Sequence, residues 1–125
     1  MQYNSYIEND IYRGDIFLCD LGEINYYDSS SIQRGFRPVI ILQNDIQNEK
    51  SPTTIVAPIT SAKKKRMMTH VKLEKGEAGI MKESIILLEQ VTTIDTFQLG
   101  RYLGSVDDNK LLKIEKALMA SLGLI

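Results

Sequence analysis

Five short apolar runs, each bounded by glycine, proline or polar residues, constrain the fold more than any other feature of this chain. They cover residues 15–21, 39–43, 53–57, 70–73 and 84–88. Runs of four to seven residues between turn formers are typical of β-strands, because helices need longer periodic segments. Since all five runs precede any helical pattern, the sequence predicts a small antiparallel β-barrel.

The C-terminal segment changes to a helical period. Leu111, Ile114, Leu118 and Leu122 fall on one face of a helix, and Gly123 is placed to end it. Ser105 and Asp108 have the spacing of a capping box at its start. We therefore expect one amphipathic helix packed on the barrel.

The segments between these runs divide into a tail, turns and loops. Residues 1–10 show no sustained period and are predicted to be an N-terminal extension, with one domain over residues 11–125. Residues 22–35 form a long polar loop, which in a small domain is usually functional or disordered. Residues 44–52 are predicted to be a turn-rich connection, residues 61–68 an exposed loop, and Gly76 and Gly79 bracket a turn.

Composition excludes several classes of protein. A chain of 125 residues can bury one ordinary core, and its net charge of −1 argues against nonspecific coating of nucleic acid. The only cysteine, Cys19, cannot pair within the chain and indicates a reducing compartment or a structural thiol. No apolar stretch approaches the ~20 residues of a membrane span, and the start lacks the apolar region of a signal peptide, so we expect a cytoplasmic protein.

The motifs of most catalytic classes are absent from the sequence. One histidine and one cysteine cannot build a structural zinc site, and the chain has no phosphate-binding glycine loop and no nucleophile elbow. If the protein is an enzyme, we expect it to work without a metal, nucleotide or covalent cofactor. Cleavage of RNA by its own 2′-hydroxyl suits this inventory, because the substrate supplies the nucleophile.

Arg37 and Thr60 are the first candidates for such chemistry. Pro38 holds Arg37 directly before the apolar residues 39–42, and a guanidinium there can hold two phosphate oxygens and stabilise developing charge. Thr60 follows the third apolar run and can donate to a phosphate oxygen. The alternatives are a solvated or ion-paired surface arginine and a simple turn threonine.

Three further features allow either a functional or a structural interpretation. His70 suits proton transfer, although a single histidine is often a half-buried strand residue. The basic residues 63–66 either guide an anionic strand or form a solvated loop. Tyr26 and Tyr27 either stack on bases or cover the core.

Seven motifs, taken in order, resemble the MazF/PemK toxins over residues 11–125. They are Arg13-Gly14-Asp15, Gly35-Phe36-Arg37-Pro38-Val39, Gln43-Asn44-Asp45, Ser51-Pro52-Thr53, Pro58-Ile59-Thr60, Thr69-His70-Val71 and the segment from Ser84 to Gln90. The resemblance implies a homodimer of small SH3-like barrels, each with a C-terminal helix. It also implies a sequence-specific, metal-independent endoribonuclease on single-stranded RNA that leaves a 2′,3′-cyclic phosphate, and a cognate antitoxin peptide that covers the RNA groove.

Residue roles follow from the same resemblance. Arg37 matches the catalytic arginine and Thr60 the threonine that helps to stabilise the transition state. Four residues match positions that line the RNA groove: Gln33, Asn44, Glu89 and Gln90. His70 is added as an RNA-contact residue, and the general base stays open between His70 and an acidic groove residue.

The loop before Arg37 departs from the family pattern. Ile32 stands where the family commonly has a glutamate, and Arg34 stands where it has a glycine. We expect this change to alter the RNA sequence that is recognised rather than the chemistry. Two rival functions on the same fold remain, a gyrase-poisoning toxin, whose relatives lack the paired arginine and threonine, and a purely protein-binding barrel.

Overall fold

The computed structural model describes residues 10–24 and 30–125 of the chain. Tyr26, Tyr27 and nearly all of the predicted N-terminal extension lie outside these residues. The extension and the interpretation of the two tyrosines therefore stay predictions.

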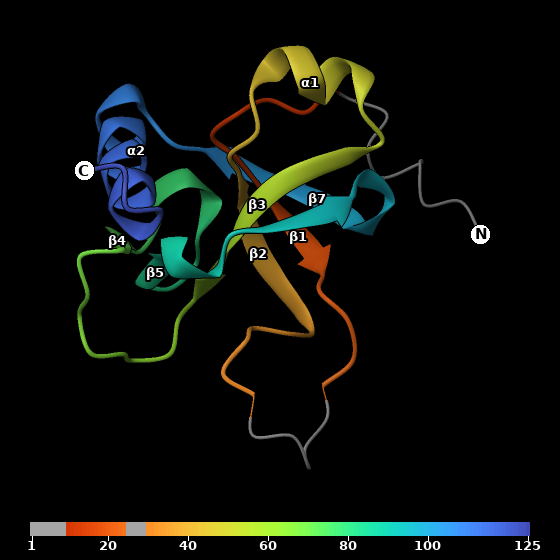
Figure 1. Cartoon of the computed structure of the whole chain (residues 1–125). Coiled ribbons are helices and arrows are strands. Elements are labelled where there is room, and N and C mark those ends of the chain that lie inside the picture. The colour runs from red at the N-terminus through yellow and green to blue at the C-terminus, as the bar shows by residue number, and fades with distance from the viewer. Residues whose placement is uncertain (1–9, 25–29) are drawn as a thin grey trace.

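Seven strands, two α-helices and three short 3₁₀ turns make up the described part of the chain (Figure 1). The strands are β1 (Asp15–Asp20), β2 (Phe36–Ile41), β3 (Thr53–Thr60), β4 (His70–Leu73), β5 (Ser84–Leu87), β6 (Thr92–Asp95) and β7 (Leu99–Ser105). The helices are α1 (Asp45–Lys50) and α2 (Asp108–Ser121), and the 3₁₀ turns are η2 (Glu77–Gly79), η3 (Leu88–Gln90) and η4 (Thr96–Gln98).

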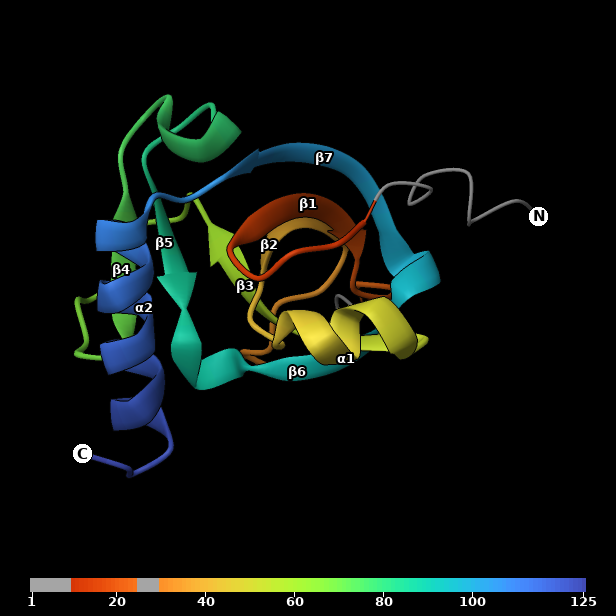
Figure 2. The same cartoon turned by 90° about the horizontal axis from the view of Figure 1, so that it is seen from above.

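The strands form one antiparallel sheet in the order β4-β5-β3-β2-β1-β7, with β6 paired to β3. β3 is the central strand: residues 53–56 pair with β6, whereas Ile59 and Thr60 pair with β5. The sheet curls strongly around its interior (Figure 2), although within the described residues no pairing joins β7 to β4 and the barrel is not closed. The prediction of a mainly β fold with a C-terminal helix is confirmed.

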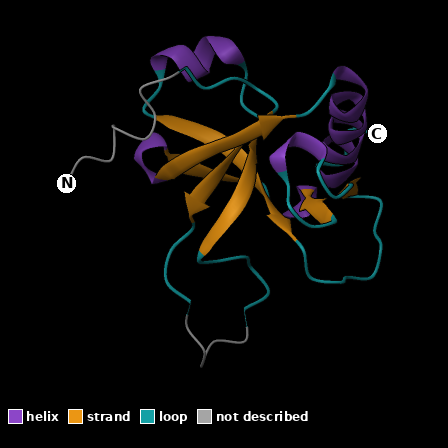
Figure 3. Cartoon of the chain, turned by 180° about the vertical axis from the view of Figure 1, so that it is seen from behind, coloured by secondary structure: helices purple, strands orange, loops and turns teal. Residues whose placement is uncertain are grey.

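Two apolar clusters form the core, one on each face of the central strands. Ile16, Ile40 and Ile59 pack with Ile114 of α2 in the first cluster, whereas Phe17, Val39 and Val56 belong to the second. Neighbouring residues of each strand enter different clusters because side chains alternate across a strand. Seen from behind, the helices lie outside the strands (Figure 3). The central strands are thus buried on both faces, which explains their continuous apolar runs.

The predicted secondary structure was incomplete in three places. β6 and β7 were missed, because β6 reads Thr-Thr-Ile-Asp and β7 contains two glycines, so neither has the apolar pattern of a strand. The predicted connection over residues 44–52 contains helix α1, which is capped by Asn44. The second and third strands also extend beyond the predicted limits, and both Arg37 and Thr60 lie inside strands.

The helix α2 begins at a different cap from the one predicted. Asp107 is the N-cap, and its carboxylate accepts a hydrogen bond from the backbone N–H of Lys110 at 2.8 Å. Ser105 instead ends β7, and its hydroxyl donates to Asp15 at 2.6 Å. The predicted stop at Gly123 is confirmed, because this glycine has a φ of 72° directly after the last turn.

Candidate functional site

Arg37 and Thr60 lie on the neighbouring antiparallel strands β2 and β3. The β2–β3 pairing ends with Val39 opposite Pro58, and Arg37 and Thr60 each lie two residues beyond this last pair, at the same end of the two strands. Both belong to the face on which Val39 and Val56 are buried, since side chains two residues apart share a face. Beyond the pair, Arg37 is paired with Cys19 of β1, whereas Thr60 is paired with Ile85 of β5.

The Arg37 guanidinium is fixed at one end and free at the other. Its Nε donates a hydrogen bond to the carbonyl oxygen of Arg34 at 2.6 Å. The segment that carries this carbonyl is itself tied to β1, because Leu21 N–H donates to Gly35 and Gly35 N–H donates to Gly22. Arg37 forms no ion pair with any residue that the structure describes, so the N–H groups of both terminal nitrogens remain available to an anion.

Thr60 ends β3 and is only 2% exposed. Its hydroxyl oxygen accepts a hydrogen bond from the backbone N–H of Ala62 at 3.1 Å, which is the turn contact that the structural interpretation predicts. A threonine hydroxyl also carries one hydrogen to donate. In the described part of the chain this hydrogen has no acceptor, so the turn contact leaves Thr60 able to donate to a phosphate oxygen.

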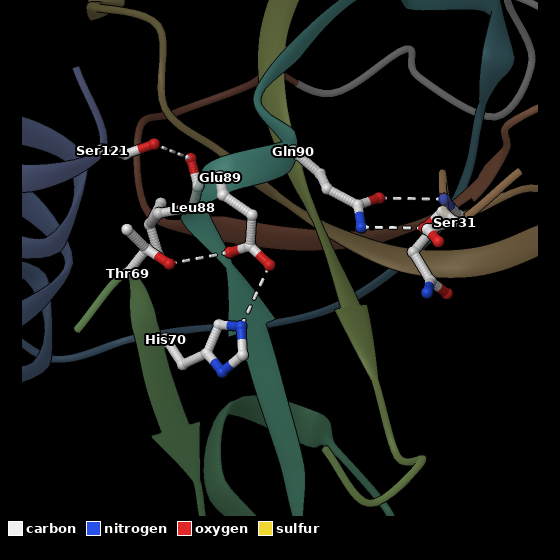
Figure 4. A network of polar contacts seen from close by, with 8 residues as sticks. Ser31, Thr69, His70, Leu88, Glu89, Gln90 and Ser121 are labelled. Carbon is white, nitrogen blue, oxygen red and sulfur yellow. Dashed lines mark hydrogen bonds and ion pairs between the residues drawn. The ribbon is translucent and has the colours of Figure 1, made fainter. Parts of the chain in front are cut away.

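Gln90 holds the loop that precedes Arg37. Its side-chain oxygen accepts from the backbone N–H of Gln33 at 2.9 Å, and its side-chain nitrogen donates to the carbonyl oxygen of Ser31 at 3.1 Å (Figure 4). Both polar ends of the carboxamide are therefore used on the backbone of this loop. Gln33 and Gln90 also line a pocket of about 300 Å³ with Arg34, Pro58 and Gln98, in which the buried Oε1 atom of Gln33 has no partner among the described residues.

Glu89 links the other side of η3 to β4. Its carboxylate contacts Nε2 of His70 at 3.0 Å and accepts a hydrogen bond from the hydroxyl of Thr69 at 3.1 Å (Figure 4). Burial raises the pKa of Glu89, but hydrogen bonds from His70, from its own backbone and from Thr69 outweigh burial, and its pKa lies below the usual value. Glu89 is therefore ionised at neutral pH, and it orients the His70 ring.

Asn44, a further predicted site residue, lies away from Arg37. It follows the opposite end of β2 from Arg37, where its side chain accepts from the backbone N–H of Gln47 at 2.9 Å and caps α1. Its neighbour Gln43 joins Asn48 and Thr54 in a buried network. The structure gives these residues a structural role and brings Asn44 to none of the other site residues.

Two contributors to the site have no signal in the sequence. The backbone carbonyl oxygens of Ser31 and Arg34 anchor Gln90 and Arg37 respectively. Any residue type supplies a backbone carbonyl, so only the folded loop identifies these two positions.

Fold and site together define a class of small, mainly β proteins in which a guanidinium without an ion pair in the described part of the chain and a threonine hydroxyl lie at the same end of adjacent strands. The chain belongs to the PemK-like, MazF-like toxins of type II toxin-antitoxin systems, because the model of that family matches residues 12–122. The family that the sequence motifs predicted is thus confirmed.

Relatives of known function and structure agree with this family. The chain is 44% identical over 115 residues to the Endoribonuclease MazF of Staphylococcus epidermidis, which covers 91% of this chain and 92% of that protein. A solved endoribonuclease in complex with its cognate antitoxin, from Mycobacterial species, is 25% identical with a TM-score of 0.75, over 92% of this chain and 97% of that one. MazF from Deinococcus radiodurans, 18% identical with a TM-score of 0.72 over 93% of this chain and 99% of that one, shows the shared fold.

The helices of this chain are short, the longest of those described being α2 (Asp108–Ser121). Over residues 10–24 and 30–125, none of them is long and apolar enough to cross a bilayer.

Proposed function

We propose that this protein is the endoribonuclease toxin of a type II toxin-antitoxin system, and that it cleaves single-stranded RNA at the Arg37–Thr60 site without a metal ion. The observation that carries the proposal is the Arg37 guanidinium, which is anchored through Nε, has no ion pair among the described residues, and lies at the same end of β2 and β3 as Thr60. A partly buried cation without an ion pair is costly unless an anion meets it. A scissile phosphate is such an anion.

The reaction follows from these groups. The 2′-hydroxyl of the RNA attacks the adjacent phosphorus, the bond from phosphorus to the 5′-oxygen breaks, and a 2′,3′-cyclic phosphate and a 5′-hydroxyl are formed. Arg37 holds two phosphate oxygens and stabilises the charge that grows in the transition state, while Thr60 donates to a nonbridging oxygen. A general base accepts the proton of the 2′-hydroxyl, and the leaving 5′-oxygen takes up a proton. The base stays open between His70 and an acidic groove residue, and His70 itself lines the groove beside β4, where it contacts Glu89.

The pocket beside the loop supports base recognition. Gln33, Arg34 and Gln90 line it, and Ile32, which replaces the family's usual glutamate, lines it as well. We assign base selection to this pocket, so the residues that differ from the family pattern are those that choose the cleavage sequence. Asn44 remains a weaker candidate for RNA contact, because it caps α1 at the other end of β2.

Partners and location follow from the family. The protein acts as a cytoplasmic homodimer, and a cognate antitoxin inhibits it by laying a peptide over the RNA groove. The solved relative with its antitoxin supports this assignment, since its chain has the same fold over nearly its whole length.

The test is cleavage of a long single-stranded RNA by purified protein in EDTA, with the 5′ ends of the fragments sequenced. We expect cleavage at one short motif, and a loss of about 10²–10³-fold in rate for Arg37→Ala and for Thr60→Val, the size expected when one donor to a transition-state oxyanion is removed. Arg101→Ala, at an exposed arginine of β7, is the matched control and keeps full activity.

An RNA that stays intact during long incubation with the folded protein contradicts the proposal. If the protein instead causes gyrase-dependent DNA cleavage, the gyrase-poisoning alternative replaces it.

A further inference from the structure

A basic groove lies between β4, the loop over residues 61–69 and α2. It has a volume of about 520 Å³. Its described lining includes five cationic side chains, one acidic side chain, Glu74, and the last residue, Ile125, although the whole chain has a net charge of −1. The cations are Arg66, Lys72, Lys110, Lys113 and Lys116. Positive charge is therefore concentrated here.

Three of the five cations have no acidic partner. Lys72 pairs with Glu74 and Glu83, and Lys110 pairs with Glu77 and donates to the carbonyl oxygen of Lys72. Arg66, Lys113 and Lys116 form no ion pair within the described chain, and all three residues are exposed. Lys113 and Lys116 lie one turn apart on α2, so they present their charge to the same groove.

His70 lines the same groove, and one of its ring nitrogens has no hydrogen-bond partner among the described residues. Its side chain is only 4% exposed and lines the groove, Nε2 faces Glu89, and the buried Nδ1 has no hydrogen-bond partner among the described residues. Buried polar atoms are nearly always paired, so an unpaired one indicates a missing ligand. A polar ligand seated in the groove supplies that partner.

The groove connects to the proposed cleavage site across the sheet. Thr60 pairs with Ile85, and Ile85 pairs with Lys72, so Thr60, Ile85 and Lys72 form one row on neighbouring strands. Two strand spacings make this row about 10 Å long, roughly the length of three stacked nucleotides. The loop that leaves Thr60 carries the exposed Lys63, Lys64 and Lys65 before it reaches Arg66 at the groove.

We infer that this groove is a second contact site for the RNA backbone, which holds phosphates a few nucleotides away from the scissile bond. The inference rests on the proposed function, because it concerns the same substrate. RNA is the occupant that fits, since the loop that carries the exposed Lys63, Lys64 and Lys65 runs from Thr60 to Arg66 at the groove. An acidic protein segment is an alternative occupant, which the experiment separates.

The test measures how the binding of RNA depends on salt. The probes are two RNAs centred on the mapped cleavage motif, of about 5 and about 15 nucleotides. Each is made in two forms, one with a 2′-deoxy sugar at the cleavage position, which stays intact and serves for binding, and one with the natural ribose, which serves for cleavage. We compare the wild type, Lys113→Gln/Lys116→Gln, and the matched control Lys50→Gln/Lys82→Gln, whose exposed lysines lie outside the groove.

We expect the groove variant to change only the binding of the long RNA. Removing two phosphate contacts on a single strand makes the negative slope of log K against log salt shallower by about 1.4. The control keeps the slope of the wild type, and all three proteins bind and cleave the short RNA equally well.

An unchanged slope for the groove variant overturns the inference while the proposed function stands, because cleavage of the short RNA is scored separately. The inference also fails if the groove variant loses binding to polyglutamate but keeps the RNA slope of the wild type, since the groove then belongs to an acidic protein segment. A wild-type protein that neither binds nor cleaves either RNA refutes the proposed function itself.

Discussion

Gln90 is hydrogen-bonded at both polar ends to the loop that precedes Arg37. Its carboxamide contacts Ser31 and Gln33, and the same loop presents the Arg34 carbonyl that anchors Arg37. The sequence predicts Gln90 as an RNA contact, whereas both of its polar ends are used inside the protein. At the scale of the residue, we therefore expect Gln90 to position the catalytic arginine.

Gln90→Glu tests this positioning role. The new carboxylate still accepts from Gln33, but its second oxygen faces the carbonyl of Ser31, so the loop and Arg37 shift. We expect kcat for RNA cleavage to fall about 10- to 100-fold, the loss typical of a small misplacement of a catalytic group, with little change in KM. Steady-state kinetics provide the measurement, with Gln47→Glu on α1 as control. A fall in binding with an unchanged kcat assigns Gln90 to direct RNA contact instead.

The 3₁₀ turn η2 and the strand β7 approach each other closely enough to require glycine on both sides. A Cβ added at Gly104 of β7 lies 2.5 Å from the carbonyl oxygen of Ala78, and one added at Gly79 lies 2.0 Å from that of Leu103. Contacts this short force the backbone to move. At the scale of the element, these two glycines set how tightly β7 packs on η2.

Gly104→Ala is expected to lower the free energy of unfolding by about 1–3 kcal/mol, the usual cost of overpacking. Gly100→Ala is the matched control on the same strand, because its nearest neighbour is the Leu18 carbonyl oxygen at 3.5 Å, an ordinary contact. We expect that variant to stay within about 0.5 kcal/mol of the wild type. Urea denaturation measures both, and equal stabilities for the two variants contradict the close packing.

Cys19 is the only cysteine of the chain and lies in the core cluster of Phe17 and Val39. The reactivity of its thiol therefore depends on whether the whole molecule is folded. It is 1% exposed, and burial, with a smaller effect from Asp20, raises the pKa of its thiol to about 12. Only the thiolate is reactive, so the folded protein keeps this thiol inert at neutral pH. The structure thus supports a structural thiol.

Labelling of Cys19 with a thiol reagent at pH 8 is therefore expected to require global unfolding. The thiol of the native protein reacts about 10³-fold or more slowly than that of the urea-unfolded chain, as the equilibrium constants of small domains imply. Spectroscopic titration with an aromatic disulfide measures the rate, and Cys19→Ser provides the blank. Rapid labelling without urea contradicts the packing around β1.

Local sequence determined a large part of this protein. The five apolar runs, the helical face of α2 and the stop at Gly123 follow from neighbouring residues alone, because periodicity and glycine conformation are local properties. The motifs around Arg37 and Thr60 likewise identified the family.

Tertiary structure decided the rest. β6 and β7 are strands because they pair with β3 and β1. Asn44 lies at a helix cap rather than beside Arg37. Tertiary structure also brought Gln90 to the loop before β2, and Lys113 of α2 to the groove beside β4. These features depend on pairing and packing between segments tens of residues apart, and no pattern of neighbouring residues encodes such contacts.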